Sequence, residues 1–413
     1  MSTCHEAGNP LPDCAGSVEQ ESPVLYGELV LLGYNGVLPD GNRGRRRSKY
    51  QVHQQNSANG VKYSKHYDVE VASNPKQNQT VVEYELDEGY DMFQIGRSSE
   101  RANQFVVIEQ ARRECTSVRE VFQSSVSRFA CRVLASRSNP KVVRVYAGGF
   151  DSSRKLFLGQ SAIKLQKKCD SKCVDGLTTN GVLLCHPRGS FSGGEAKAGL
   201  WHEVSLCGEI LSLRDARSAH QPGEILEDET NVLQDGSLID LCGVTLLWRS
   251  ADALRASPTS HTLEALVDDL NAGRPQCPVG LNTLVLPRTL SSVGGEDGRH
   301  APYVYLKCGH VQGLHAWGRE RGAAGRRCPM CREVSTAVKL CLGSEPAFYV
   351  DVGKLTHAFN PCGHLATEKT VKYWSSVPVP RGGNGFEVMC PFCGALLSGS
   401  PGYIRLIFQD NLD

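Results

Sequence analysis

Short apolar runs separated by turn-forming residues dominate the chain from about residue 23 to about residue 250. They begin with "YGELVLLGYNG", and glycine, asparagine, aspartate or proline separates many of them. The later runs are "FVVIE", "RFACRVLA", "KVVRVYAGG", "KLFLG", "GVLLCHP", "WHEVSLCG", "EILSL" and "SLIDLCGVTLLW". Many short strands without a long amphipathic helix are typical of an antiparallel β-sandwich, which we predict over residues 23–254.

A different periodicity follows in "SPTSHTLEALVDDLNAG". Its apolar positions recur at the i, i+3, i+4, i+7 spacing of one amphipathic helix face. These positions are Leu263, Leu266, Val267 and Leu270. Ser257 or Thr259 can cap the start of the helix, and Gly273 is expected to end it. We interpret residues 255–275 as a linker helix that leads into a separate cysteine-rich domain over residues 276–413.

Composition favours an ordinary globular protein. The 413 residues are 40% apolar and carry a net charge of +1, so no strong field favours nucleic acid or an anionic membrane. The basic run at 41–50 is therefore interpreted as a solvated loop. No run of about 18 apolar residues could span a bilayer, and residues 1–22 are polar, without a secretory signal, and expected to be disordered. We expect a cytoplasmic protein with no membrane insertion and no nucleic-acid partner.

The C-terminal part repeats one cysteine pattern. "KCGHVQGLHAWG" leads to "RRCPMCRE", and "PCGHLATEKTVKYW" leads to "VMCPFCGA". Each half holds Cys-Gly-His, an aromatic residue and Cys-Pro-x-Cys. The candidate ligands are Cys308, His310, Cys328, Cys331, Cys362, His364, Cys390 and Cys393. Six thiolates and two imidazoles suffice for two tetrahedral zinc ions, and the 17 cysteines of an intracellular chain favour metal ligands over disulfides.

The spacing has a physical reason. Two cysteines three positions apart can hold one metal from a tight turn, which the proline stiffens, and the glycine of Cys-Gly-His brings thiolate and imidazole together. Four protein ligands at each ion leave no open position for water, so we expect structural zinc that stabilises the fold. The pairing stays open: it can be cross-braced, or sequential with one ion in each half.

Other thiols and imidazoles carry weaker signals. Cys277 in "QCPVG" begins like Cys-Pro-x-Cys, but Gly280 stands where the second cysteine would be. It can be a relic, a buried thiol or an extra ligand. Cys341, His315 and His357 are interpreted as packing or surface residues.

The stretch "VDGLTTNGVLLCHP" admits two interpretations. Thr178, Thr179, Asn180 and Gly181 stand directly before an apolar run. Asn-Gly is the strongest short hairpin-turn signal, and threonine is favourable beside a strand, so a plain turn explains these residues taken alone. The rest of the chain changes that balance.

The order of "CPMC", "PCGH", "YW" and "CPFC" resembles a RING-type ubiquitin ligase domain, without its usual His-x-x-Cys ligand pair. That departure resembles the Pellino family, whose tail is RING-like. The similarity covers nearly the whole chain apart from the N-terminus. It extends to "YGELVLLGYNG", "GRRRSKY", "MFQIGRSSE", "SRFACRV", "AGGFDSS", "DGLTTNGV", "TNVLQDGSLIDLCGVTLLWRS" and "RPQCPVGLNTL".

The resemblance implies a forkhead-associated (FHA) sandwich that reads phosphothreonine. Its motif residues would be Arg97, Ser127, Arg128, Thr179 and Asn180. Phosphothreonine carries a charge of about −1.5 to −2, which an arginine fork and a serine hydroxyl can bind. The threonine and the asparagine suit the backbone of a bound peptide.

The resemblance also implies two further features of the sandwich. Ala130 stands where FHA domains usually carry a histidine, as in the family, so another group must brace the serine loop. A wing is expected in inserts near residues 40–80 and 190–235. The predicted fold is therefore mainly β: a winged FHA-type sandwich followed by a small zinc-bound RING-like α+β domain.

The function implied is that of an E3 ubiquitin ligase. Such a ligase holds a ubiquitin-conjugating enzyme and its ubiquitin in a reactive pose, so no cysteine here is expected to act as a nucleophile. The implied partners are phosphorylated receptor-associated kinases of Toll and interleukin-1 receptor signalling. The alternative is a non-catalytic, phosphorylation-dependent adaptor, which the missing His-x-x-Cys pair keeps open.

Overall fold

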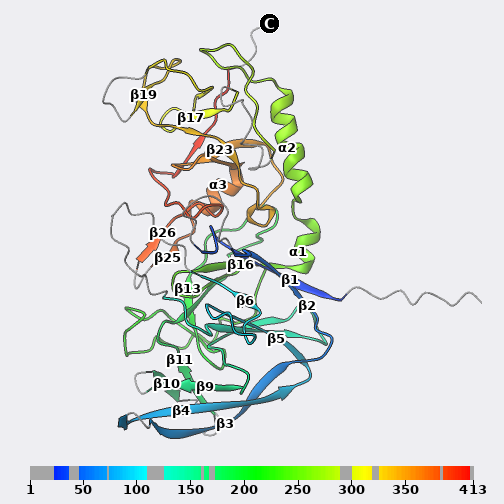
Figure 1. Cartoon of the computed structure of the whole chain (residues 1–413), viewed down its shortest axis with the longest axis vertical. Coiled ribbons are helices and arrows are strands. Elements are labelled where there is room, and N and C mark those ends of the chain that lie inside the picture. The colour runs from blue at the N-terminus through cyan, green and yellow to red at the C-terminus, as the bar shows by residue number, and fades with distance from the viewer. Residues whose placement is uncertain are drawn as a thin grey trace, which may run out of the picture.

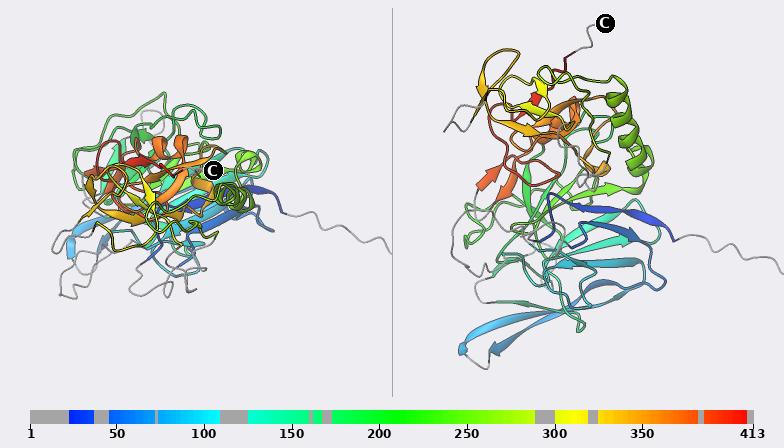
Figure 2. Two further views of the ribbon diagram at one scale, coloured as in Figure 1. Left: turned by 90° about the horizontal axis from the view of Figure 1, so that it is seen from above. Right: turned by 45° about the horizontal axis from the view of Figure 1, so that its top comes forward.

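The computed structural model describes most of the chain, and the predicted disordered segment 1–22 lies outside the described residues. The described ranges are 23–36, 46–71, 74–108, 125–159, 162–166, 173–288, 300–318, 325–381 and 385–409. Figure 1 shows a β-rich N-terminal part below and a smaller C-terminal part above, and Figure 2 shows the same arrangement from two further sides. The predicted mainly β fold is confirmed.

Two sheets face each other in the N-terminal part. The larger sheet has the order β14-β13-β12-β15-β16-β1-β2, and the smaller has the order β6-β5-β7-β8. The strands of the larger sheet are β1 (Leu25–Leu31), β2 (Lys49–His53), β12 (Val182–Cys185), β13 (Trp201–Val204), β14 (Ile210–Leu211), β15 (Leu238–Asp240) and β16 (Thr245–Ser250). Those of the smaller sheet are β5 (Tyr90–Gly96), β6 (Phe105–Val106), β7 (Cys131–Ser136) and β8 (Val143–Ala147). A core of buried aliphatic and aromatic side chains fills the space between them.

A long hairpin extends from this sandwich. Strands β3 (Gly60–Val71) and β4 (Asn74–Asp87) pair along nearly their whole length, and β9 (Lys155–Leu158) joins β4. The hairpin lies at the lower end of Figure 1, far from the C-terminal part. Strands β10 (Ile163–Gln166) and β11 (Val174–Leu177) form a separate pair beside it.

Two helices connect the parts. The predicted helix is α2 (Ser260–Ala272), capped by Thr259, and Gly273 follows its last residue. Its buried side chains, Leu263 and Val267, belong to the expected apolar face. A short helix that the sequence did not predict, α1 (Ala251–Ala256), continues directly from β16 and has Ser250 as its N-cap.

The C-terminal part consists of short strands around one helix, α3 (Glu368–Trp374). Its sheets have the orders β18-β17-β21, β19-β20, β22-β24-β23-β27 and β25-β26. These strands are β17 (Tyr303–Tyr305), β18 (Val311–Gln312), β19 (Arg326–Arg327), β20 (Val334–Ser335), β21 (Ala337–Lys339), β22 (Cys341–Leu342), β23 (Leu355–Phe359), β24 (His364–Thr367), β25 (Val379–Arg381), β26 (Gly385–Glu387) and β27 (Tyr403–Arg405). A 3-10 turn, η2 (Pro346–Phe348), precedes β23.

The central strands of the larger sheet are buried on both faces. In β1, Leu29 and Leu31 face the sandwich core, while Val30 packs into a second core with residues of the C-terminal part. In the same way Leu184 of β12 faces inward and Leu183 faces the C-terminal part. Because successive strand residues point to opposite faces, runs such as "VLLC" are continuously apolar when both faces are covered.

A buried arginine lies at the junction between the larger sheet and the C-terminal part. The Arg249 side chain, at the end of β16, is fully buried and pairs with Asp235 at 2.9 Å. Its guanidinium also donates to the Ala347 carbonyl oxygen at 2.7 Å and lies 4.7 Å from the ring centre of Phe191. The two parts therefore share one core and a desolvated polar contact. Within the described residues, no helix is both long and apolar enough to cross a membrane.

Candidate functional site

Three loops meet at one end of the sandwich. Arg97 directly follows β5, and Ser127 and Arg128 precede β7. Thr179 and Asn180 join β11 to β12. The structure therefore brings residues more than fifty positions apart to the same end of the fold.

Hydrogen bonds connect these loops. The Arg97 backbone N–H donates to the Ser127 carbonyl oxygen at 3.1 Å. The Asn180 side-chain amide donates to the Ser125 carbonyl oxygen at 2.6 Å and to the Ser127 hydroxyl oxygen at 3.3 Å. Asn180 therefore sets the position of the serine that the sequence analysis assigned to the phosphate.

The two arginines of the site have different surroundings. The Arg97 side chain is exposed, and none of the described residues forms an ion pair or side-chain hydrogen bond with it. Arg128 is also exposed but pairs with Glu100, and its guanidinium lies 5.5 Å from the ring centre of Phe129. Arg97 is thus the better-placed cation for an incoming anion, because the Arg128 charge already has a partner.

Asn103 is a residue that the sequence analysis missed. Its side chain is buried and donates to the Ser98 carbonyl oxygen at 2.9 Å and to the Arg128 carbonyl oxygen at 2.8 Å. The Gln94 amide donates to the Asn103 side-chain oxygen at 3.2 Å. This buried amide therefore holds the Arg97 loop and the Ser127 loop together. Ala130, at the position where a bracing histidine is usual, cannot do so. The signal in the sequence was the amide pair Asn103-Gln104 directly before the apolar run "FVV", where a buried polar side chain needs partners.

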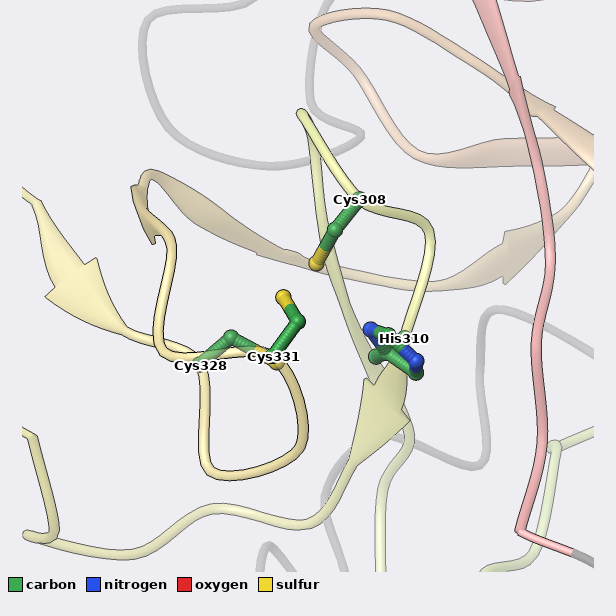
Figure 3. A group of neighbouring side chains, drawn as sticks. All are labelled: Cys308, His310, Cys328 and Cys331. Carbon is green, nitrogen blue, oxygen red and sulfur yellow. The ribbon is translucent and has the colours of Figure 1, made fainter.

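The second feature is a pair of cysteine-histidine groups in the C-terminal part. One is formed by Cys308, His310, Cys328 and Cys331, and the other by Cys362, His364, Cys390 and Cys393. Within each group the ligand atoms lie within 4.8 Å of one another. Tetrahedral zinc with bonds of about 2.3 Å would place two sulfurs about 3.8 Å apart, so the spacing is close to that of a loaded site. Figure 3 shows the first group with its side chains converging.

The grouping is sequential, with one group in each half of the repeat. The question of pairing that the sequence left open is therefore answered in favour of separate halves. In each half the Cys-Gly-His turn depends on a glycine: Gly309 and Gly363 have φ of +77° and +75°. A Cβ on Gly309 would lie 2.1 Å from the Arg405 carbonyl oxygen.

The two Cys-Pro-x-Cys turns have the same backbone hydrogen bonds. The Cys328 N–H donates to the backbone carbonyl oxygen of Glu333 at 2.8 Å, and the Cys390 N–H donates to that of Ala395 at 2.9 Å. The turn at Cys277 repeats this geometry, with a bond of 2.9 Å from Cys277 N–H to the Asn282 carbonyl oxygen. There the Gly280 N–H points to the Cys277 sulfur at 3.3 Å. Cys277 is buried in the core and belongs to neither described group, which favours the buried-thiol interpretation over an extra ligand.

The donor atoms fit a metal ion. The Nδ1 atoms of His310 and His364 are buried and have no hydrogen-bond partner among the described residues. A cation held by the groups would give such ring nitrogens a ligand role. Burial raises the pKa of the Cys308 thiol to about 12, and a bound cation would favour the thiolate instead. Three thiolates with one imidazole form a donor set typical of structural zinc.

The remaining candidates lie outside both groups. His315 contacts the Gln312 side-chain oxygen at 2.5 Å, and His357 packs against Tyr403. Cys341 lies on β22, beside the strand that carries His364, and its sulfur faces the Gly363 carbonyl oxygen at 3.9 Å.

Comparison with known proteins accounts for the combination of three loops at one end of the sandwich with two cysteine-histidine groups. The family model "Pellino, FHA domain" matches residues 17–266, and "Pellino, RING domain" matches residues 270–413. The chain belongs to the Pellino family. Three Pellino relatives align along almost the whole chain.

Protein pellino of Drosophila melanogaster is 56% identical over 419 residues, covering 98% of this chain and 97% of the relative. E3 ubiquitin-protein ligase pellino homolog 2 of Homo sapiens is 49% identical, covering 97% of this chain and 98% of the relative. E3 ubiquitin-protein ligase pellino homolog 3 of Mus musculus is 46% identical, with 98% and 95% covered. The Pellino resemblance predicted from the sequence is confirmed.

Proposed function

We propose that this Pellino-family chain is a RING-type E3 ubiquitin ligase that selects its substrates through phosphothreonine. The observation that carries the proposal is the presence, in one chain, of two four-ligand groups in a Pellino RING domain and an exposed Arg97 beside Ser127 in a Pellino FHA domain. Relatives that align along the whole chain are named E3 ubiquitin-protein ligases. The reaction needs no nucleophile from this chain, because a RING-type ligase contributes positioning.

The eight cysteine and histidine residues would hold two zinc ions, one in each half of the repeat. Zinc suits the mixed thiolate and imidazole donors, and four protein ligands leave no position for a reacting water. The ions would stabilise the surface to which a ubiquitin-conjugating enzyme and its ubiquitin bind. Ubiquitin would pass from the conjugating enzyme directly to a substrate lysine.

The end of the sandwich where the three loops meet would bind the substrate. Arg97 can meet a phosphate dianion with a fork of N–H donors, and Ser127 can add one bond. Thr179 and Asn180 would contact the peptide backbone, and Arg128 would add a weaker second charge because Glu100 already pairs with it. The partners we propose are phosphorylated receptor-associated kinases of Toll and interleukin-1 receptor signalling, in the cytoplasm.

A calorimetric titration tests the binding half of the proposal. The ligand is a phosphothreonine peptide selected from an oriented library, with its unphosphorylated twin as a reference. Arg97→Ala should weaken phosphopeptide binding by about 30- to 1000-fold, because the charge-assisted bonds to the dianion are lost. Arg101→Ala is the matched control, since that arginine is also exposed and follows the same strand. Full phosphate preference in the Arg97 variant would exclude this site.

A discharge assay tests the enzymatic half. The zinc-loaded chain should accelerate loss of ubiquitin from the thioester of at least one conjugating enzyme in a panel, with free lysine as acceptor. The Cys328→Ala, Cys331→Ala double variant should lose this acceleration. If the wild-type chain accelerates none of them while it still binds phosphopeptide, the adaptor alternative is the better account.

A further inference from the structure

A segment behind the Thr178–Gly181 loop holds that loop in place. Residues 212–219, which we call the strap, follow β14 and lie within the second predicted insert. The strap carries two arginines whose side chains are only 4% and 10% exposed, Arg214 and Arg217. Buried arginines need charged and hydrogen-bonding partners, and here part of those partners belongs to the loop.

Arg217 connects the loop to the sheet beneath it. One guanidinium nitrogen pairs with the Asp240 carboxylate, which is fully buried on β15. The other donates to the carbonyl oxygens of Asn180 at 3.0 Å and Gly181 at 3.3 Å. Asp240 is itself held by the Thr245 hydroxyl at 2.8 Å.

Arg214 also connects the loop to the sheet, at Thr178, two positions before Asn180. It pairs with Glu203 of β13 through two bonds of 2.8 and 2.7 Å. The nitrogen that forms the second of these also donates to the Thr178 carbonyl oxygen at 3.3 Å. A further bond to the Ala219 carbonyl oxygen, at 3.0 Å, fixes Arg214 to its own strap.

The two arginines thus direct three loop carbonyls toward the strap. With the backbone held this way, the Asn180 side chain extends toward the serine loop, where it contacts Ser125 and Ser127. We propose that Arg214 and Arg217 are positioning residues of the phosphopeptide site, which set the Asn180 amide for a peptide backbone without contacting the peptide. This inference rests on the proposed phosphothreonine-binding function.

Arg217→Lys tests it most sharply. A single ammonium group can keep the charge opposite Asp240, but it cannot occupy the positions of two guanidinium nitrogens at once. The variant should therefore fold and keep its ion pair while the hold on Asn180 and Gly181 is lost. In the zinc-loaded full chain, phosphopeptide affinity should fall about fivefold to tenfold, as expected for one or two hydrogen bonds.

Two readouts separate positioning from general damage. Binding of the free amino acid phosphothreonine, which lacks the peptide backbone, should fall clearly less than peptide binding, because Arg97 is untouched and only the Asn180 bond to Ser127 is disturbed. The side-chain amide signal of Asn180, followed by NMR in an asparagine-labelled chain without ligand, should shift. Arg188→Lys is the control, because that exposed arginine donates to the Ala198 carbonyl oxygen and, within the described part of the chain, makes no hydrogen bond to the Thr178–Gly181 loop.

The outcomes are distinct. Wild-type peptide affinity in Arg217→Lys, or an equal loss for peptide and free phosphothreonine, overturns the positioning role while the proposed function stands. If the wild-type chain binds the phosphorylated peptide no better than its unphosphorylated twin, the proposed function fails, and this inference fails with it.

Discussion

The Asn180 amide donates to the Ser127 hydroxyl oxygen across 3.3 Å. Because that oxygen accepts from Asn180, the hydroxyl hydrogen of Ser127 can point outward to an anion. Ser127→Ala should therefore lose one bond and weaken phosphopeptide binding by about fivefold to tenfold, well below the loss from Arg97→Ala. Calorimetry with one phosphopeptide ranks the two variants. Ser138→Ala, at an exposed turn, is the control, and an equal loss for Ser127→Ala and Arg97→Ala would contradict the assignment.

The Asn103 brace should matter for both stability and binding. Asn103→Ala removes the buried side-chain donor to the Ser98 carbonyl oxygen and one of the two donors to the Arg128 carbonyl oxygen, which then keeps only the Ser98 N–H. We expect a loss of about 1–3 kcal/mol in unfolding free energy, measured by urea denaturation, and weaker phosphopeptide binding. Asn139→Ala, at a surface turn, should change neither quantity. Unaltered binding by a folded Asn103→Ala chain would show that the loops keep their places without the brace.

Metal removal should unfold the C-terminal part, because the ions would supply much of its folding energy. We expect two zinc ions per chain by elemental analysis. Cys390→Ala should reduce the count by one, since the groups are separate. Cys277→Ala is a stringent control: it removes a buried thiol from a turn of the same geometry, and the count should stay at two. Loss of zinc from the Cys277 variant would make that thiol a ligand.

Arg249 should contribute to the free energy of unfolding through the junction between the N-terminal and C-terminal parts. Arg249→Met removes the partner of Asp235 and the donor to Ala347, both at a buried site. Breaking a buried charge pair costs about 3–5 kcal/mol, and we expect a loss of that order in chemical denaturation. Arg255→Met is the matched control because its side chain is 80% exposed on the adjacent helix. Equal midpoints for the two variants would mean that the junction contributes little.

The sequence was most informative where a function is carried by neighbouring residues. Arg97, Ser127 and Asn180 stand in short motifs, and each Cys-Pro-x-Cys turn holds two ligand candidates within four positions. The α2 helix was predictable because its cap, its apolar face and Gly273 are all local. The resemblance to the Pellino family then joined these pieces.

The sequence was least informative about contacts between distant residues. Asn103 bonds to a carbonyl 25 positions away, and Arg217 to one 37 positions away. A buried amide or arginine looks ordinary until its partner is known. The shared core was visible in the sequence as the continuously apolar runs "LVLL" and "VLLC", which lack the alternation of a half-exposed strand. One face of these strands packs in the sandwich core, and the other packs against the C-terminal part.

The most direct test of the account joins both halves in one reaction. A substrate protein carrying the selected phosphothreonine sequence is compared with its unphosphorylated twin in a reconstituted ubiquitin-transfer assay. The wild-type chain should modify the phosphorylated substrate at least about tenfold faster at limiting concentration, while Arg97→Ala should modify both at the slow rate and retain normal discharge to free lysine. Equal rates for the two substrates with the wild-type chain, or a preference that survives in Arg97→Ala, would contradict the account.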